Sequence, residues 1–95
     1  MRGYVIANID VRDAPGYEAY RSRTADIIAQ YGGRFLVRGG KVEVREGEPG
    51  ISRLVVLEFP DMEAARTFYD SPEYQAILPH RTDNSTATLF LAEGV

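Results

Sequence analysis

Two pairs of adjacent glycines, Gly32-Gly33 and Gly39-Gly40, most constrain what this chain can fold into. Glycine adopts left-handed backbone conformations without steric cost, so such pairs mark places where regular structure ends. The first pair follows a helical pattern and predicts its end. Residues 35–37 before the second pair and residues 42–44 after it are β-prone. We therefore expect an extra β-hairpin with a tight primed turn at Gly39-Gly40.

Strand and helix patterns alternate along the rest of the chain. Residues 4–11 alternate apolar and polar side chains, which is typical of a strand with one dry face. Residues 51–59 are rich in β-branched and apolar residues, and residues 86–92 predict a last strand. Ser71 predicts the start of a short helix that Pro79 limits. Two earlier helices are predicted from apolar stripes, which comprise Tyr17, Tyr20, Thr24, Ile27, Ile28 and Tyr31 in the first and Met62, Ala65, Phe68 and Tyr69 in the second.

This order of elements predicts an α+β fold, in which a split βαβ pair forms an antiparallel sheet with the helices on one face. The 95 residues make one domain, residues 1–95. The opposite sheet face would carry Tyr4, Ile6, Asn8 and Asp10 from the first strand. An exposed face with apolar content usually marks contact with a partner.

Composition narrows the classes of function. The net charge of -3 makes nucleic acid a poor partner, and no apolar run is long enough to span a membrane. The N-terminal residues turn polar before a signal-peptide core could form, so we expect a cytoplasmic protein. There is no cysteine and only one histidine, which leaves no metal-ligand spacing. We expect neither a metal nor another cofactor.

Several motifs carry a family resemblance. In order along nearly the whole chain they are Tyr17-Glu18-Ala19-Tyr20, Tyr31-Gly32-Gly33-Arg34, Gly39-Gly40, Ser71-Pro72-Glu73-Tyr74 and Arg81. This pattern resembles the domain of unknown function 1330 family, which is similar to the dimeric α/β-barrel superfamily. The resemblance implies a ferredoxin-like βαββαβ protomer that pairs sheet to sheet as a homodimer. Relatives often carry a tryptophan upstream of Ile51, whereas this chain has none, so a pocket shaped by that ring would differ here.

The resemblance also implies a small-molecule site but no single reaction. Members of the superfamily include cofactor-free quinol-type monooxygenases, haem-dependent enzymes and muconolactone-type isomerases. They place ligands in the cleft between helices and sheet or inside the paired barrel. Fold analogy cannot choose among these chemistries.

The candidate catalytic residues are His80, Arg81 and Asn8. Histidine titrates near neutral pH, and Arg81 beside it could hold a carboxylate or an enolate oxygen. An amide on the first strand, such as that of Asn8, could stabilise an oxyanion. The alternatives are an exposed loop histidine with a surface arginine, and a hydrogen bond of Asn8 or Asp10 at a dimer interface.

The candidate substrate-binding residues are Tyr4, Arg53, Tyr69 and Tyr74. Tyrosines can line a ligand pocket, although packing in the core is their ordinary role. Three functions stay open from the sequence. The chain is a cofactor-independent enzyme that acts on a compact organic acid or a quinol-like compound, a non-catalytic metabolite-binding or stress-associated module, or a purely structural dimer whose inner space is filled by side chains.

Overall fold

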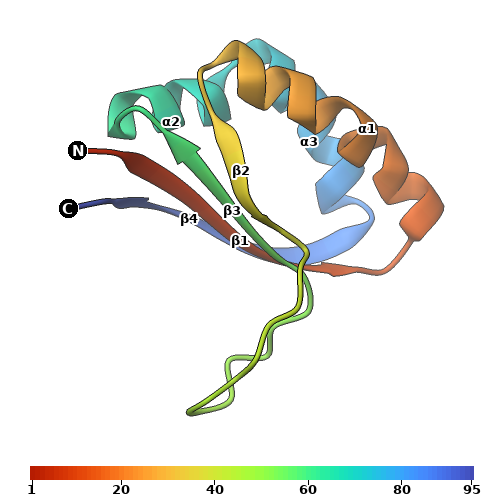
Figure 1. Cartoon of the computed structure of the whole chain (residues 1–95). Helices are drawn as coiled ribbons and strands as arrows, with labels where there is room; N and C mark the ends of the chain where they lie inside the picture. Colours follow the sequence, from red (N-terminus) through yellow and green to blue (C-terminus); the bar gives the residue numbers. More distant parts are fainter.

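The sheet of this protein has four antiparallel strands in the order β2-β3-β1-β4, and all helices lie on one of its faces (Figure 1). The computed structural model describes all 95 residues. It confirms the α+β, ferredoxin-like arrangement. None of the helices has both the length and the apolar character needed to cross a membrane. The elements are β1 (Gly3–Val11), α1 (Ala14–Gln30), β2 (Arg34–Arg38), β3 (Leu54–Phe59), α2 (Met62–Asp70), α3 (Pro72–Thr82) and β4 (Ser85–Glu93).

Alternation along β1 decides which sheet face is covered. Val5, Ala7 and Ile9 are buried against the helices, whereas Ile6 and Asn8 are only half-buried on the opposite face. This period of two is what a strand with one buried face requires. The opposite face, called here the bare sheet face, has no helix over it (Figure 1).

Side-chain caps fix where the helices begin. The carboxylate of Asp13 accepts a hydrogen bond from the Gly16 N–H at 3.1 Å, and Asp61 does the same for Ala64 at 2.7 Å. The Ser71 hydroxyl accepts from the Tyr74 N–H at 3.1 Å. Each cap satisfies a backbone donor that the first helical turn leaves free.

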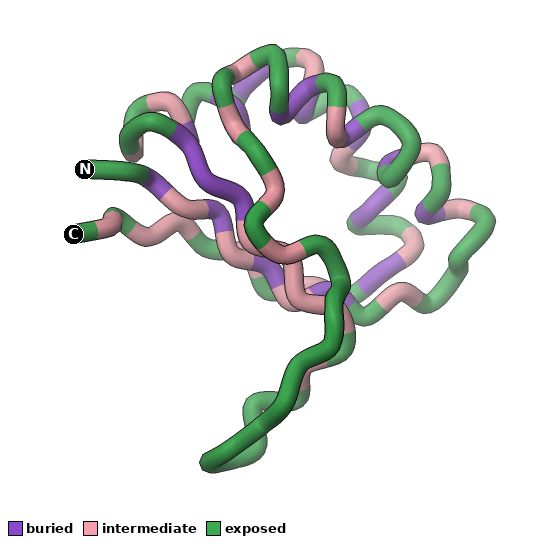
Figure 2. The backbone as a smooth tube through the Cα atoms, viewed as in Figure 1, coloured by how far each residue is buried: buried purple, intermediate pink, exposed green.

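The core beneath the helices is largely aromatic. Phe68 of α2 lies 5.1 Å from Phe59 of β3 and 4.7 Å from Tyr74 of α3, between ring centroids. Gly33 is required by this packing, because a Cβ there would lie 2.5 Å from the Phe59 ring. Figure 2 shows buried positions that recur along the strands of the sheet and along the helices that cover it. Aromatic burial therefore joins α2 and α3 to the sheet.

The hairpin expected at Gly39-Gly40 is not formed, because residues 42–44 make no strand. β2 pairs with β3 instead, and the Gly39 N–H donates to the Leu54 carbonyl at 2.8 Å. β3 buries Leu57 and Phe59, whereas residues 41–48 alternate charged side chains with only two valines. Pairing with β3 thus buries far more apolar surface. Residues 39–53, called here the arm, extend from the sheet on the side of the bare sheet face, and β3 begins at Leu54 rather than Ile51 (Figure 1).

The expectation that Pro79 limits the last helix is also wrong, since α3 continues to Thr82. Pro79 has no backbone N–H to donate to the Gln75 carbonyl, as a helix would require. Both residues are exposed, so this carbonyl can accept a hydrogen bond from water instead. The final turn is held by bonds from the Asp83 N–H to the Pro79 carbonyl at 2.9 Å and from the Ser85 hydroxyl to the Arg81 carbonyl. These bonds offset the break in the helical ladder.

A hydrogen bond from the Tyr31 hydroxyl to the Glu73 carboxylate joins the end of α1 to the start of α3 and lowers the pKa of Glu73. We expect Tyr31→Phe to raise that pKa, because the charged form loses its donor. A lowered folded-state pKa contributes stability that is present above the unfolded-state pKa and lost as pH falls through the folded-state pKa. The stability advantage of wild type over the variant should therefore shrink on acidification.

NMR titration of the Glu73 carboxyl carbon and denaturant unfolding at several pH values measure both effects. A Glu73→Gln background serves as the control, since Tyr31→Phe should then have no acid-dependent effect. An unchanged Glu73 pKa in Tyr31→Phe would contradict the prediction.

Candidate functional site

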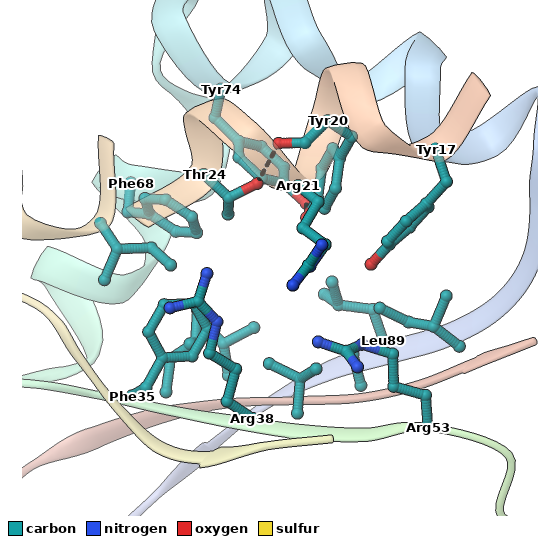
Figure 3. A pocket seen from close by; sticks show the side chains of 16 residues that line it. Tyr17, Tyr20, Arg21, Thr24, Phe35, Arg38, Arg53, Phe68, Tyr74 and Leu89 are labelled. Atoms are coloured by element: carbon teal, nitrogen blue, oxygen red, sulfur yellow. Dashed lines mark hydrogen bonds between the residues drawn. The ribbon is translucent and has the colours of Figure 1, made fainter. Parts of the chain in front are cut away.

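A small cavity, called here the α1 cavity, lies between α1 and the helix-covered face of the sheet (Figure 3). Twelve of its 16 lining residues are hydrophobic, and the others are Thr24 and three arginines. The volume of the cavity is about 40 Å³. A single water needs a cavity of about 10–15 Å³, and a cavity of about 150 Å³ holds benzene. The enclosed part therefore fits a group of a few heavy atoms rather than a ring.

Three guanidinium groups lie at the opening of the α1 cavity. Arg21 extends from α1, Arg38 from β2 and Arg53 from the arm, and their side chains point toward the middle of the opening (Figure 3). Arg21 pairs with Glu18 at 3.0 Å, whereas neither Arg38 nor Arg53 is within 4.0 Å of a carboxylate. Arg38 instead lies over the Phe35 ring, 4.4 Å from its centroid. The opening thus carries more positive than negative charge.

The backbone around Arg53 is fixed on both sides. Its carbonyl accepts a bond from the Ile9 N–H at 2.9 Å. The Asn8 side chain donates to the Gly50 carbonyl at 3.0 Å and accepts from the Ser52 N–H at 2.9 Å. Gly39, at a φ of +71°, leaves room for the guanidinium, since a Cβ there would lie 2.2 Å from an Arg53 nitrogen. The Nε of Arg53 is buried and has no hydrogen-bond partner.

Two tyrosines on the helix side of the α1 cavity share a hydrogen bond. The hydroxyls of Tyr20 and Tyr74 are 2.8 Å apart, and both residues line the cavity. Burial raises the pKa of each above its ordinary value, and the nearby positive charge of Arg81 opposes that effect in part. Both hydroxyls are therefore protonated at neutral pH and can act as donors, not as bases.

His80 and Arg81, the proposed catalytic pair, do not converge. His80 is exposed on α3, where its carbonyl accepts from the Asn84 side chain at 2.7 Å. Arg81 is only 5% exposed, its Nε has no partner, and its guanidinium lies 5.7 Å from the Tyr20 ring centroid. Successive helical residues point in directions about 100° apart, which explains the separation. Arg81 therefore lies behind the Tyr20–Tyr74 pair. Neither His80 nor Arg81 lines the cavity.

The other predicted residues divide between the two sides of the sheet. Tyr4 lies on the bare sheet face, with its hydroxyl 3.4 Å from Glu58, and Asn8 holds the root of the arm on that face. Tyr69 packs behind Tyr74 with ring centroids 5.3 Å apart, and it does not line the cavity. Of the seven predicted residues, only Arg53 and Tyr74 lie at the cavity.

Sequence reasoning missed the site roles of Arg21, Arg38, Tyr17 and Tyr20. Tyr17 and Tyr20 belong to the apolar stripe predicted for the first helix, where core packing is the ordinary role of tyrosine. Arg21 is exposed, yet it directly follows Tyr20 at the border of the buried stripe and so reaches the opening. That border position was the available signal. No group of three or more histidine, aspartate or glutamate side chains comes together to hold a metal ion.

Structural comparison finds the same fold in solved proteins of low sequence identity. A protein of unknown function from Rhodopseudomonas palustris superposes with a TM-score of 0.74 at 15% identity, over 99% of this chain and 82% of that one. SnoaB, a cofactor-independent oxygenase from Streptomyces nogalater, superposes with a TM-score of 0.65 at 21% identity, over 99% of this chain and 93% of that one. A dimeric protein of unknown function and ferredoxin-like fold from Bacteroides fragilis superposes with a TM-score of 0.55 at 15% identity, over 98% of this chain and 96% of that one.

A search of curated protein sequences finds no match. The profile of the family described as "Domain of unknown function (DUF1330)" matches residues 2–95. This match covers nearly the whole chain, and the protein belongs to the DUF1330 family.

Proposed function

We propose that this protein binds a compact organic metabolite in the α1 cavity. The observation that carries the proposal is an apolar cavity whose opening holds three guanidinium groups with a single carboxylate partner among them. Small-molecule sites are typically concave and mostly apolar, with a few convergent polar groups that orient the ligand. The small volume of about 40 Å³ favours a compact ligand over a ring.

The lining of the cavity favours binding over acid–base catalysis. It contains no histidine, aspartate, glutamate, lysine or cysteine. Tyr20 and Tyr74 carry raised pKa values and stay protonated at neutral pH. A general base needs a pKa near the working pH, and none of these residues meets that condition. Metabolite binding without conversion is therefore the function that the geometry supports best.

Narrowing the cavity should abolish binding. We expect Ala7→Val to remove the stabilisation that short branched ligands give, because Ala7 is 3% exposed and lines the cavity. A bound ligand stabilises the fold by RT ln(1 + [L]/Kd), so thermal unfolding with isobutyrate and isobutyramide measures the effect. The matched control is Ala76→Val at an exposed position of α3, which should keep the wild-type shift. A shift retained in a cooperatively folded Ala7→Val would refute this site.

Cofactor-independent oxygenation is a second candidate. The Tyr20–Tyr74 hydroxyl pair, with Arg81 behind it, could donate to a developing oxyanion. The neighbour from Streptomyces nogalater with this fold is a cofactor-independent oxygenase. A substrate carbanion that adds dioxygen gives a peroxide anion, which needs one proton and no external reductant. Since the cavity offers no base, the substrate would have to arrive already ionised.

Dioxygen uptake tests the oxygenase candidate. If the protein is such an oxygenase, acetylacetone at mildly alkaline pH, where part of it is the enolate, should give protein-dependent uptake in an oxygen electrode. Tyr74→Phe should lower the rate about 10-fold or more, because one donor to the oxyanion is lost. Tyr69→Phe is the control, since Tyr69 does not line the cavity. No uptake above the protein-free rate would exclude this reaction for that probe and leave the binding proposal standing.

A homodimer is the assembly that the bare sheet face supports. Across that face Ile6 pairs in register with Val56 of β3 and with Phe90 of β4, and Phe90 is 51% exposed. The arm extends on the same side and exposes Val44 (Figure 1). The neighbour from Bacteroides fragilis with this fold is dimeric. A second copy of the chain would cover this apolar stripe.

Charge at the centre of the stripe should separate the copies. We expect Ile6→Asp to shift the protein from dimer toward monomer, because the carboxylate would be desolvated in the contact. Sedimentation equilibrium measures the dissociation constant, which should rise at least about 100-fold. Ala76→Asp, on exposed α3, is the control and should stay dimeric. A wild-type protein that is monomeric at micromolar concentration would refute the dimer.

A further inference from the structure

We infer that the ligand of the α1 cavity is a short-chain carboxylate and that Arg53 is the residue that binds its charged end. This inference rests on the proposed binding function and narrows it to one chemical class. Like charges repel, so three guanidinium groups converge on one opening at a free-energy cost unless an anion joins them. Only Arg21 has a carboxylate partner, and Glu18, which supplies it, is exposed on the outer side of α1. The arrangement of charges therefore favours binding of an anion from outside the chain.

Arg53 is the pre-positioned member of the three. Arg21 and Arg38 are exposed side chains, and Arg38 is engaged with the Phe35 ring. Arg53 is half-buried, and its Nε is shielded from water without a hydrogen-bond acceptor. A buried donor without a partner destabilises the folded protein, and a hydrogen bond to an acceptor on a ligand would offset that cost. The Nε–H of Arg53 thus lacks an acceptor, which a bound carboxylate oxygen would supply.

Asn8 acts as a positioning residue for Arg53. Its side chain bonds to Gly50 and Ser52, which fixes the backbone just before Arg53. Gly39 completes the arrangement, because a Cβ there would displace the guanidinium from this position. A side chain that is already held loses less conformational entropy when it binds a ligand.

Carboxylate is the anion that fits both parts of the site. The planar guanidinium fork matches a carboxylate in a two-point contact. Beyond the opening the wall is apolar, with Ala7, Val55 and Leu89 among the lining side chains. The enclosed volume of about 40 Å³ suits a short branched alkyl group. Inorganic phosphate would use the arginines and leave this apolar wall uncovered.

A matched pair of ligands isolates the charge. Backbone amide chemical-shift titration gives the Kd of isobutyrate and of isobutyramide, which have the same shape. We expect isobutyrate to bind the wild-type protein about 10- to 100-fold more tightly, as for one or two charge-assisted hydrogen bonds. Added NaCl should weaken the binding of isobutyrate and leave that of the amide unchanged. Inorganic phosphate should bind more weakly than isobutyrate.

Variants then assign the preference to Arg53. Arg53→Gln should abolish the preference for acid over amide, and Arg53→Lys, which keeps the charge without the planar fork, should retain part of it. Asn8→Ala should lower the preference and leave the affinity for the amide unchanged, which a general loss of structure would not do. Arg23→Gln, at an exposed position of α1 away from the opening, is the matched control.

The outcomes separate this inference from the proposed function. Equal binding of acid and amide, both lost in Ala7→Val, would overturn the inference and keep the binding site. Phosphate binding as tight as that of isobutyrate would also overturn it. If neither isobutyrate nor isobutyramide binds, the proposed function and the inference both fail. If Arg53→Gln does not fold, the salt dependence in wild type and the Arg53→Lys variant decide the question.

Discussion

Burial of a single sheet face beneath aromatic side chains is the interaction on which the rest of this structure depends. Phe68 and Tyr74 connect the helices to Phe59 and to Tyr20 through rings whose centroids lie 4.7 to 5.9 Å apart. Such rings bury much area but pack with fixed geometries, so small side chains beside them leave gaps. Ala7 and Thr24 both border the α1 cavity. The cavity is thus a product of how this core is packed.

Two arginines in this protein have a buried Nε without a partner, and their surroundings give them different roles. Arg81, on α3, is buried and its guanidinium lies over the Tyr20 ring, so its charge acts within the protein, where it opposes the rise in the pKa of Tyr20 and Tyr74. Arg53 instead lines the opening of the α1 cavity, where a ligand can reach it. A cation–π contact stabilises a desolvated guanidinium partly, which fits the internal position of Arg81.

The sequence predicted the element order and the covered sheet face because both follow from local periodicity, as in the alternation of Val5, Ala7 and Ile9. It failed at residues 42–44, since which strand pairs with β2 is decided by the apolar surface that β3 buries and not by the glycine turn. It also failed at the site. Local patterns say that Arg21 is exposed, but they do not say that it meets Arg38 and Arg53, which come from distant elements. Convergence of this kind is a property of the tertiary fold.

Asn8 connects the two surfaces for which we propose a function. Its side chain lies on the bare sheet face and bonds to the root of the arm, and the next residue along the arm, Arg53, reaches the α1 cavity on the other face. The dimer contact and the ligand site would therefore be separated by one layer of sheet. A change at Asn8 alters both surfaces at once, whereas Ile6 is confined to the bare face and Ala7 to the cavity. Neighbouring residues of one strand would thus separate the proposed assembly from the proposed binding, because their side chains point to opposite faces.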